Sequence, residues 1–77
     1  MNNMCVLTNL AVGQSAKIGR LDSQGGIRRR LQDIGLIEGT RVECVLKSPA
    51  ADPIAYRVRG AVIALRNEDS DRITVSL

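Results

Sequence analysis

The sequence predicts one small, mainly β domain, a barrel with a single short α-helix. Apolar and polar residues alternate in several short runs, which is the pattern of strands with one buried face. Turn-forming residues separate these runs, and only one segment has the periodicity of a helix. Tyr56 is the only aromatic residue among the 77, so we expect a core of Ile, Leu, Val and Ala.

The first long strand is predicted at residues 15–21. Its apolar residues are Ala16, Ile18 and Leu21, and Leu21 is out of phase with the other two by one position. A β-bulge at Gly19 would correct the phase, and all three apolar side chains would then face the core.

The only helix is predicted from Gln24 to Ile34. Ile27, Leu31 and Ile34 lie at positions i, i+4 and i+7 and form one apolar stripe. We therefore expect Leu31 and Ile34 to be buried in the core.

Both ends of this helix have sequence signals. At its start, either Asp22 or Ser23 is expected to cap the free N–H groups. At its end, Gly35 is expected to take a positive φ, which glycine adopts without steric cost. Leu36 would then pack back on the last helical turn.

The other four strands are predicted from the same alternation, at residues 41–47, 54–59, 62–66 and 73–77, with a short strand-like piece at residues 5–8 as an optional addition before the first. The residues assigned to their apolar phases are Val42, Cys44, Leu46, Ile54, Tyr56, Val58, Ile63, Leu65, Ile73, Val75 and Leu77. The polar segment 67–71 is interpreted as a turn, with a single helical turn as the alternative.

Five short strands in so short a chain cannot build a two-sheet sandwich with a deep core, and curling into a barrel protects the strand edges. The predicted fold is therefore a small SH3-like barrel of about five strands, with one short α-helix between the first long strand and the second. Residues 1–77 are expected to form a single domain.

The sequence lacks the residues of common catalytic and metal sites. It contains no histidine, which excludes imidazole bases and histidine-activated nucleophiles. Cys5 and Cys44 are far apart, and Cys44 alternates with apolar residues, so we expect it to be a buried thiol in a reducing compartment. Gly25-Gly26 lacks the Lys-Ser/Thr of a phosphate loop. We expect no enzyme activity, no cofactor and no metal ligands, although a weak oxygen-ligand site stays open.

Arginines provide the candidate binding residues. On the predicted helix, Arg29 lies opposite the apolar stripe, and Arg28 and Arg30 flank it, so the three cannot form one flat clamp. Arg57 and Arg59 are predicted to share the outer face of one strand. Either pair, Arg28 with Arg29 or Arg57 with Arg59, is a solvated face or a partner-binding patch.

The segment 29–40 contains a basic pair followed by Leu, then Ile34-Gly35-Leu36, then a Gly turn into a strand. Other motif residues precede and follow it in order: Leu7, Leu10, Gly13, Ala16, Ile18, Pro49, Asp52-Pro53-Ile54, Val58-Arg59-Gly60, Ala64-Leu65-Arg66, Ile73 and Val75. This ordered set resembles the ferrous iron transport protein A family (FeoA) over nearly the whole chain. Glu38, Ala51 and Ser70 depart from the family pattern, and all three lie in predicted turns.

The resemblance implies an SH3-like barrel in the cytoplasm, similar also to the C-terminal domain of diphtheria toxin repressor-type iron-dependent repressors. It implies an accessory or regulatory role for a FeoB-type membrane ferrous iron transporter, through the transporter's cytoplasmic GTPase domain. Two alternatives stay open, a nucleic-acid-binding SH3-like domain and a weak transition-metal sensor. A net charge of +3 and a single aromatic residue argue against nucleic acid as the partner.

Overall fold

A computed structural model describes residues 4–22 and 25–77 of the protein. The elements follow in the order β1 (Met4–Val6), the 3-10 helix η1 (Leu7–Asn9), β2 (Ser15–Leu21), α1 (Gly25–Asp33), β3 (Arg41–Lys47), β4 (Ile54–Val58), β5 (Ala61–Leu65), α2 (Asn67–Ser70) and β6 (Ile73–Ser76). The mainly β class and the position of α1 between the first two long strands are confirmed.

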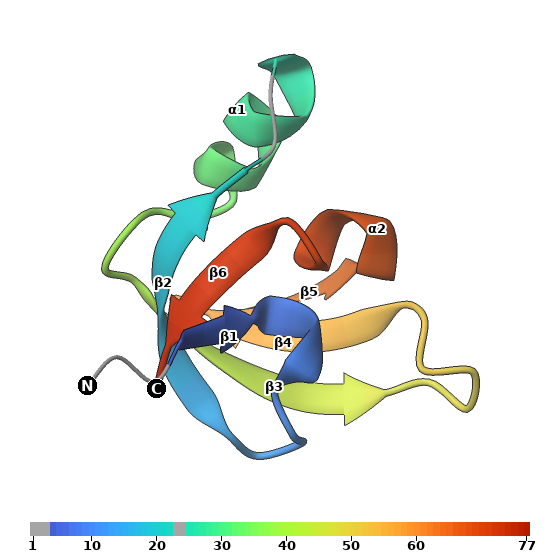
Figure 1. The fold of residues 1–77 in the computed structure, drawn as a ribbon. Helices are drawn as coiled ribbons and strands as arrows, with labels where there is room; N and C mark the ends of the chain where they lie inside the picture. The colour runs from blue at the N-terminus through green and yellow to red at the C-terminus, as the bar shows by residue number, and fades with distance from the viewer. Residues whose placement is uncertain (1–3, 23–24) are drawn as a thin grey trace.

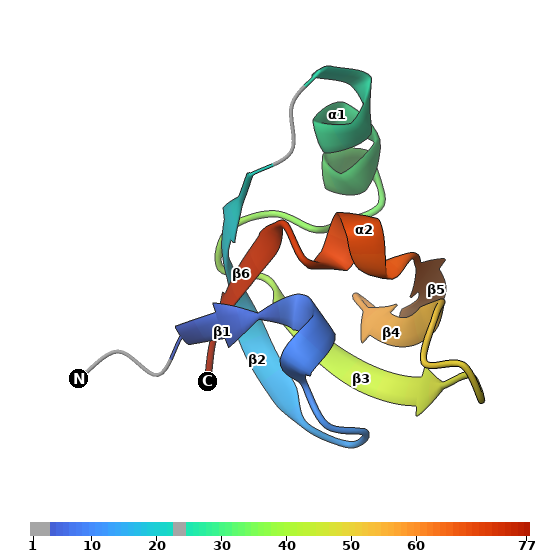
Figure 2. The same ribbon diagram turned by 45° about the vertical axis from the view of Figure 1, so that its right-hand side comes forward.

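The strands form one antiparallel sheet of six strands in the order β1-β6-β2-β3-β4-β5. The sheet curls around the core, and α1 lies beyond one end of β2, above the strands in both views (Figures 1 and 2). The segment predicted as a strand-like piece at residues 5–8 is divided between β1 and η1. The segment 67–71 contains the helical turn α2, which was the alternative interpretation.

Strand β2 agrees with its prediction in bounds, phase and irregularity. The pairing of β2 with β6 shifts register between Ile18 and Arg20, which places the bulge at Gly19. Ala16, Ile18 and Leu21 are all buried as a result. A bulge of this kind adds one residue to one strand and so restores the inward phase of the side chains that follow.

Tyr56 occupies the middle of the aliphatic core and is fully buried. Its hydroxyl donates a hydrogen bond to the backbone carbonyl of Leu7, with 3.4 Å between the oxygens. Nearby, the hydroxyl of Thr8 donates to the Asp71 carboxylate at 2.6 Å and lies 2.6 Å from the hydroxyl of Ser70. Because the single proton of Thr8 is used on Asp71, Ser70 donates to Thr8. These contacts connect η1 to β4 and α2.

Two predicted core residues of the strands are exposed. Leu46 has 63% of its surface exposed, because the pairing of β3 with β4 shifts register between Cys44 and Leu46. Leu77 is 54% exposed and follows the end of β6. The other residues assigned to apolar phases are buried, apart from Ile63, which is partly buried against the core.

The burial predicted for the apolar stripe of α1 is confirmed at Leu31 and wrong at Ile34. Leu31 is buried, but Ile27 is 51% exposed and Ile34 is 39% exposed. The stripe does not face the core as a whole because α1 lies beyond the end of the barrel, not across it (Figure 2). A helix placed in this way buries only the side chains nearest the strands.

The end of α1 agrees with its prediction. Gly35 has a φ of +107°. The N–H of Leu36 bonds to the carbonyl of Leu31, and the N–H of Gly35 bonds to the carbonyl of Gln32, both at 3.0 Å. This is the Schellman arrangement, and Leu36 is fully buried with Leu31 in the core.

The predicted start of α1 is only partly described. Ser23 and Gln24 lie outside the described residues. The capping prediction for Asp22 and Ser23 therefore lies outside the described residues. The carboxylate of Asp22 forms an ion pair with Arg20 at 3.0 Å.

Over residues 4–22 and 25–77, no helix has the length and apolar character needed to cross a membrane.

Candidate partner-binding surface

Helix α1 is flanked by two surface hollows. The first, of about 450 Å³, lies between α1, the end of β2 and the segment after Leu36. The second, of about 490 Å³, lies between α1, the end of β5 and α2. Because α1 stands clear of the barrel, each of its sides faces one hollow. The helix and its two hollows form the candidate binding surface.

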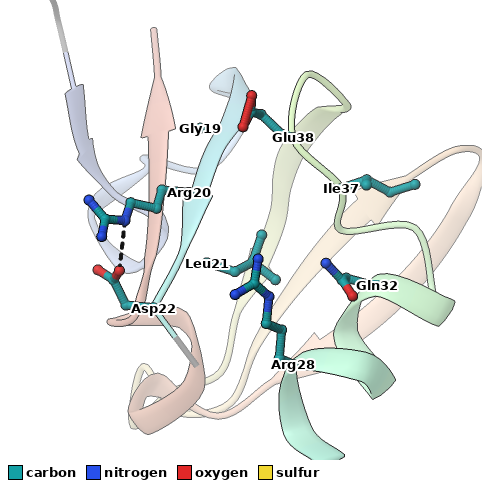
Figure 3. A pocket seen from close by; sticks show the side chains of 8 residues that line it. All are labelled: Gly19, Arg20, Leu21, Asp22, Arg28, Gln32, Ile37 and Glu38. Atoms are coloured by element: carbon teal, nitrogen blue, oxygen red, sulfur yellow. Dashed lines mark ion pairs between the residues drawn. The ribbon is translucent and has the colours of Figure 1, made fainter. Parts of the chain in front are cut away.

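The first hollow has a polar rim (Figure 3). Arg28 extends from α1 toward Leu21 of β2, and Gln32 lies beside it on the same helix. Glu38 and Ile37 come from the segment that follows α1. This rim presents a cation, an amide and a carboxylate next to the side chain of Ile37, which is 40% exposed.

Only some of the charged side chains around this hollow form ion pairs. Arg20 and Asp22 neutralise each other through their ion pair. Within the described part of the chain, neither Arg28 nor Arg29 forms an ion pair. Their guanidinium groups therefore remain available to an acidic partner surface.

The three helix arginines spread as the sequence predicted. Arg28 lines the first hollow and Arg30 lines the second, so they lie on opposite sides of α1. Arg29 is exposed and lines neither of these two hollows. A single partner could contact Arg28 and Arg29 together, because they are adjacent on the exposed side of the helix.

The two residues of the second predicted pair, Arg57 and Arg59, lie in different elements. Arg57 lies on β4 opposite Glu43 of β3, and the two side chains form an ion pair at 3.5 Å. Arg59 was predicted in the strand but lies in the turn after it, with a φ of +53°. Its aliphatic stem lies against Gly35 at the end of α1. The prediction that Arg57 and Arg59 share one strand face is therefore wrong.

Exposed isoleucines are the part of this surface that the sequence prediction missed. Ile27 and Ile34 line the second hollow, and Ile37 lines the first. The sequence contained a signal for this exposure, because three consecutive arginines leave the helix little surface that can be buried. An apolar stripe on such a helix is as consistent with a binding face as with a core contact.

The described residues offer little to a metal ion. No three His, Cys, Asp or Glu side chains gather into a potential site in residues 4–22 and 25–77. Cys5 and Cys44 are free thiols, and Cys44 is buried as predicted. Burial raises the pKa of the Cys44 thiol, which disfavours the thiolate that metal binding needs.

The FeoA domain family matches residues 5–77 of the chain. A curated relative, the "Fe(2+) transport protein A/Fe(2+) transporter FeoB fusion protein" of Porphyromonas gingivalis, is 34% identical over 71 residues. These residues are 92% of this chain but only 8% of that protein, so the chain matches a small part of a much longer polypeptide.

Solved structures agree with this match. Iron(II) transport protein A from Clostridium thermocellum is 32% identical, with a TM-score of 0.91 over 95% of this chain and 45% of that one. FeoA of Stenotrophomonas maltophilia, described as an SH3 domain protein complexed with zinc, is 29% identical, with a TM-score of 0.79 over 92% and 88% of the two chains. The SH3-like fold is thereby confirmed.

The predicted likeness to metal-dependent repressors is also present, at the level of the fold. A manganese-dependent transcriptional repressor is 20% identical, with a TM-score of 0.85, and the alignment covers 44% of that chain and 100% of this one. The chain therefore corresponds in fold to less than half of such a repressor.

Proposed function

The chain belongs to the FeoA family, which takes part in ferrous iron transport, and we propose that it serves iron uptake by binding a FeoB-type transporter at its cytoplasmic GTPase domain. In this proposal the protein is a cytoplasmic accessory or regulatory subunit. It acts through a surface and performs no chemistry of its own.

The observation that carries this proposal is the fused relative of P. gingivalis, in which a domain 34% identical to this chain shares one polypeptide with FeoB. Covalent connection keeps two modules at a high effective concentration, typically millimolar for a short flexible linker. Without such a connection, a domain with the same task would have to reach the transporter through a binding surface of its own.

The first hollow is the part of the surface that fits this task best. Tyr56 is buried, and the sequence has no Phe or Trp, so the surface has no aromatic anchor. Arginine is the remaining residue type that often dominates interface energies. Arg28 and Arg29 are unpaired within the described part of the chain, whereas Arg57 is already paired with Glu43. We therefore place the contact on Arg28 and Arg29, with Ile37 as its apolar neighbour.

The interface is expected to be weak. A domain of this size offers about 600–800 Å² to one partner, which lies at the low end of specific interfaces. Without aromatic anchors, we expect a dissociation constant above about 1 µM.

Titration of the isotope-labelled protein with the FeoB GTPase domain tests the proposal. We expect chemical-shift changes at Arg28, Gln32 and Ile37, measured with the GTPase domain both empty and bound to a GTP analogue. Absence of shifts in both states would reject the GTPase domain as the target. A parallel titration with the full transporter in lipid nanodiscs then distinguishes a wrong domain from a wrong partner.

A further inference from the structure

Strand β5 forms one edge of the sheet. The strand order ends in β1 on one side and β5 on the other. The β1 edge is only three residues long, whereas β5 has five residues, which pair with β4 on one side only. An edge strand presents N–H and C=O groups to which another chain can bind.

The turn before β5 determines which backbone groups of the strand point away from β4. Arg59 and Gly60 both have positive φ, +53° and +82°, and connect β4 to β5 as a two-residue hairpin. Val58 and Ala61 close this hairpin as a hydrogen-bonded pair, and such pairs alternate along an antiparallel ladder. The backbone groups of Val62 and Ala64 therefore point away from β4, to the free edge.

Residues 61–65 themselves carry none of the features by which an edge strand usually resists pairing. Natural edge strands carry charged side chains, a proline or a bulge, or are very short. Residues 61–65 read Ala-Val-Ile-Ala-Leu, without charge or proline. Their pairing with β4 runs without a register shift. Val62 is 55% exposed.

We propose that this edge binds the same edge of a second copy of the chain, so that two sheets join antiparallel through β5. With Ile63 opposite Ile63 of the second copy, Val62 lies opposite Ala64 of the second copy. Val62 and Ala64 then exchange backbone hydrogen bonds across the symmetry axis, about four in all. A two-fold interface needs a self-complementary strand, and an uncharged strand meets no like charge in this pairing.

The charges on either side of β5 suit the same arrangement. Arg59 precedes the strand, whereas Arg66 follows it directly and Glu68 and Asp69 follow in the first turn of α2, so residues 66–69 carry a net charge of −1. Antiparallel pairing brings the beginning of one β5 beside the end of the other. Arg59 of each copy then faces the acidic turn of the other copy, which favours this orientation.

The second hollow gives the exposed side chain of Val62 a place to bind. Ala64 lines this hollow together with Ile27 and Ile34 of α1. Residues opposite each other on paired strands point to the same face of the sheet. Val62 of the second copy, beside Ala64, therefore brings an apolar side chain to the two exposed isoleucines. Arg28 lines the other hollow, so the dimer leaves the proposed transporter contact free.

Sedimentation equilibrium of the full chain tests this inference, over about 20 µM to about 1 mM, since a contact this small gives a weak dimer. We expect a monomer–dimer equilibrium that Val62→Lys weakens at least tenfold. Val12→Lys is the matched control, because Val12 is 57% exposed and lies in the loop before β2. Thermal melts verify that both variants fold.

Amide hydrogen exchange provides the second measurement. The N–H groups of Val62 and Ala64 should exchange more slowly at high protein concentration than at low concentration. A chain that stays monomeric at about 1 mM would overturn the inference. So would a Val62→Lys variant that dimerises like the parent, or an equal loss of dimer in the Val12→Lys control.

Discussion

Gly35 and Arg59 pack directly against each other, which connects the end of α1 to the turn between β4 and β5. A Cβ added at Gly35 would lie 3.2 Å from Cδ of Arg59 and 3.2 Å from Cγ1 of Val58. Since Val58 is buried, it has little room to move. Glycine is therefore required at this position for two reasons, the φ of +107° and this close approach.

Substitution of Gly35 is expected to destabilise the protein strongly. Gly35→Ala should lower the free energy of unfolding by about 2 kcal/mol or more, because it adds backbone strain to the contact with Val58. Gly26→Ala is the control, since a Cβ at Gly26 meets nothing within 4 Å. It should stabilise the helix by about 0.5–1 kcal/mol. Urea unfolding measures both, and equal effects would contradict the assigned helix end.

The attachment of α1 to the barrel is expected to depend on Leu31. Leu31→Ala should cost about 2–5 kcal/mol, because it leaves a cavity under the helix. Ile34→Ala should cost less than about 1 kcal/mol, because Ile34 is 39% exposed. Equilibrium denaturation compares the two variants. A larger loss at Ile34 than at Leu31 would show that the helix is rotated relative to this structure.

Because Tyr56 is buried, we expect the protein to lose stability at high pH. Burial raises the pKa of its phenol from 10.0 to about 12. The folded protein therefore holds the proton more tightly than the unfolded chain. This contribution to stability is complete below pH 10 and is lost as the pH rises toward about 12.

Spectroscopy can follow this titration without interference, because Tyr56 is the only tyrosine and the chain has no tryptophan. Absorbance at the tyrosinate wavelength should show a midpoint near pH 12 while the protein stays folded. Urea-unfolded protein should titrate near pH 10 and serves as the reference. Equal midpoints in both states would contradict the burial of the hydroxyl.

Metal binding by the isolated protein is expected to be weak. The chain has no histidine, and burial raises the pKa of one of its two thiols. Anaerobic calorimetry with Fe²⁺, and separately with Zn²⁺, should show no stoichiometric site tighter than about 1 µM. Cys5→Ser tests the more exposed thiol. A tighter site in the parent that this variant lacks would contradict the expectation.

The parts of the fold that were predicted correctly depend on residues close together in the sequence. The bulge at Gly19 follows from the phase of Ile18 and Leu21, and the helix end follows from Gly35 and Leu36. Leu46 could not be placed in this way. Its exposure depends on a register shift against β4, and that shift is a property of the pairing and not of β3 alone.

The candidate site was predicted only in part. The spread of Arg28 and Arg30 follows from helix geometry and was correct. The exposure of Ile27 and Ile34 depends on the position of α1 relative to the barrel. The spacing of apolar residues along the helix carries no information about that position. Arg59 was placed in a strand because alternation continues through it, whereas the hairpin turn begins there.

The central claim is that this protein acts by binding a FeoB-type transporter through α1, and charge reversal tests it most directly. Calorimetric titration of the FeoB GTPase domain should compare the parent with two double variants. Arg28→Glu with Arg29→Glu removes the proposed contact. Arg57→Glu with Arg59→Glu makes the same change of net charge on the barrel. Circular dichroism must show that both variants fold.

We predict that the Arg28/Arg29 variant binds the GTPase domain at least tenfold more weakly than the parent, a loss of about 1.4 kcal/mol. The Arg57/Arg59 variant should stay within about threefold of the parent, because Arg57 is already paired with Glu43. Equal weakening by both variants would show that net charge, not α1, governs binding. Parent-like affinity in the Arg28/Arg29 variant would contradict the proposed surface, and absence of binding by the parent protein would contradict the claim itself.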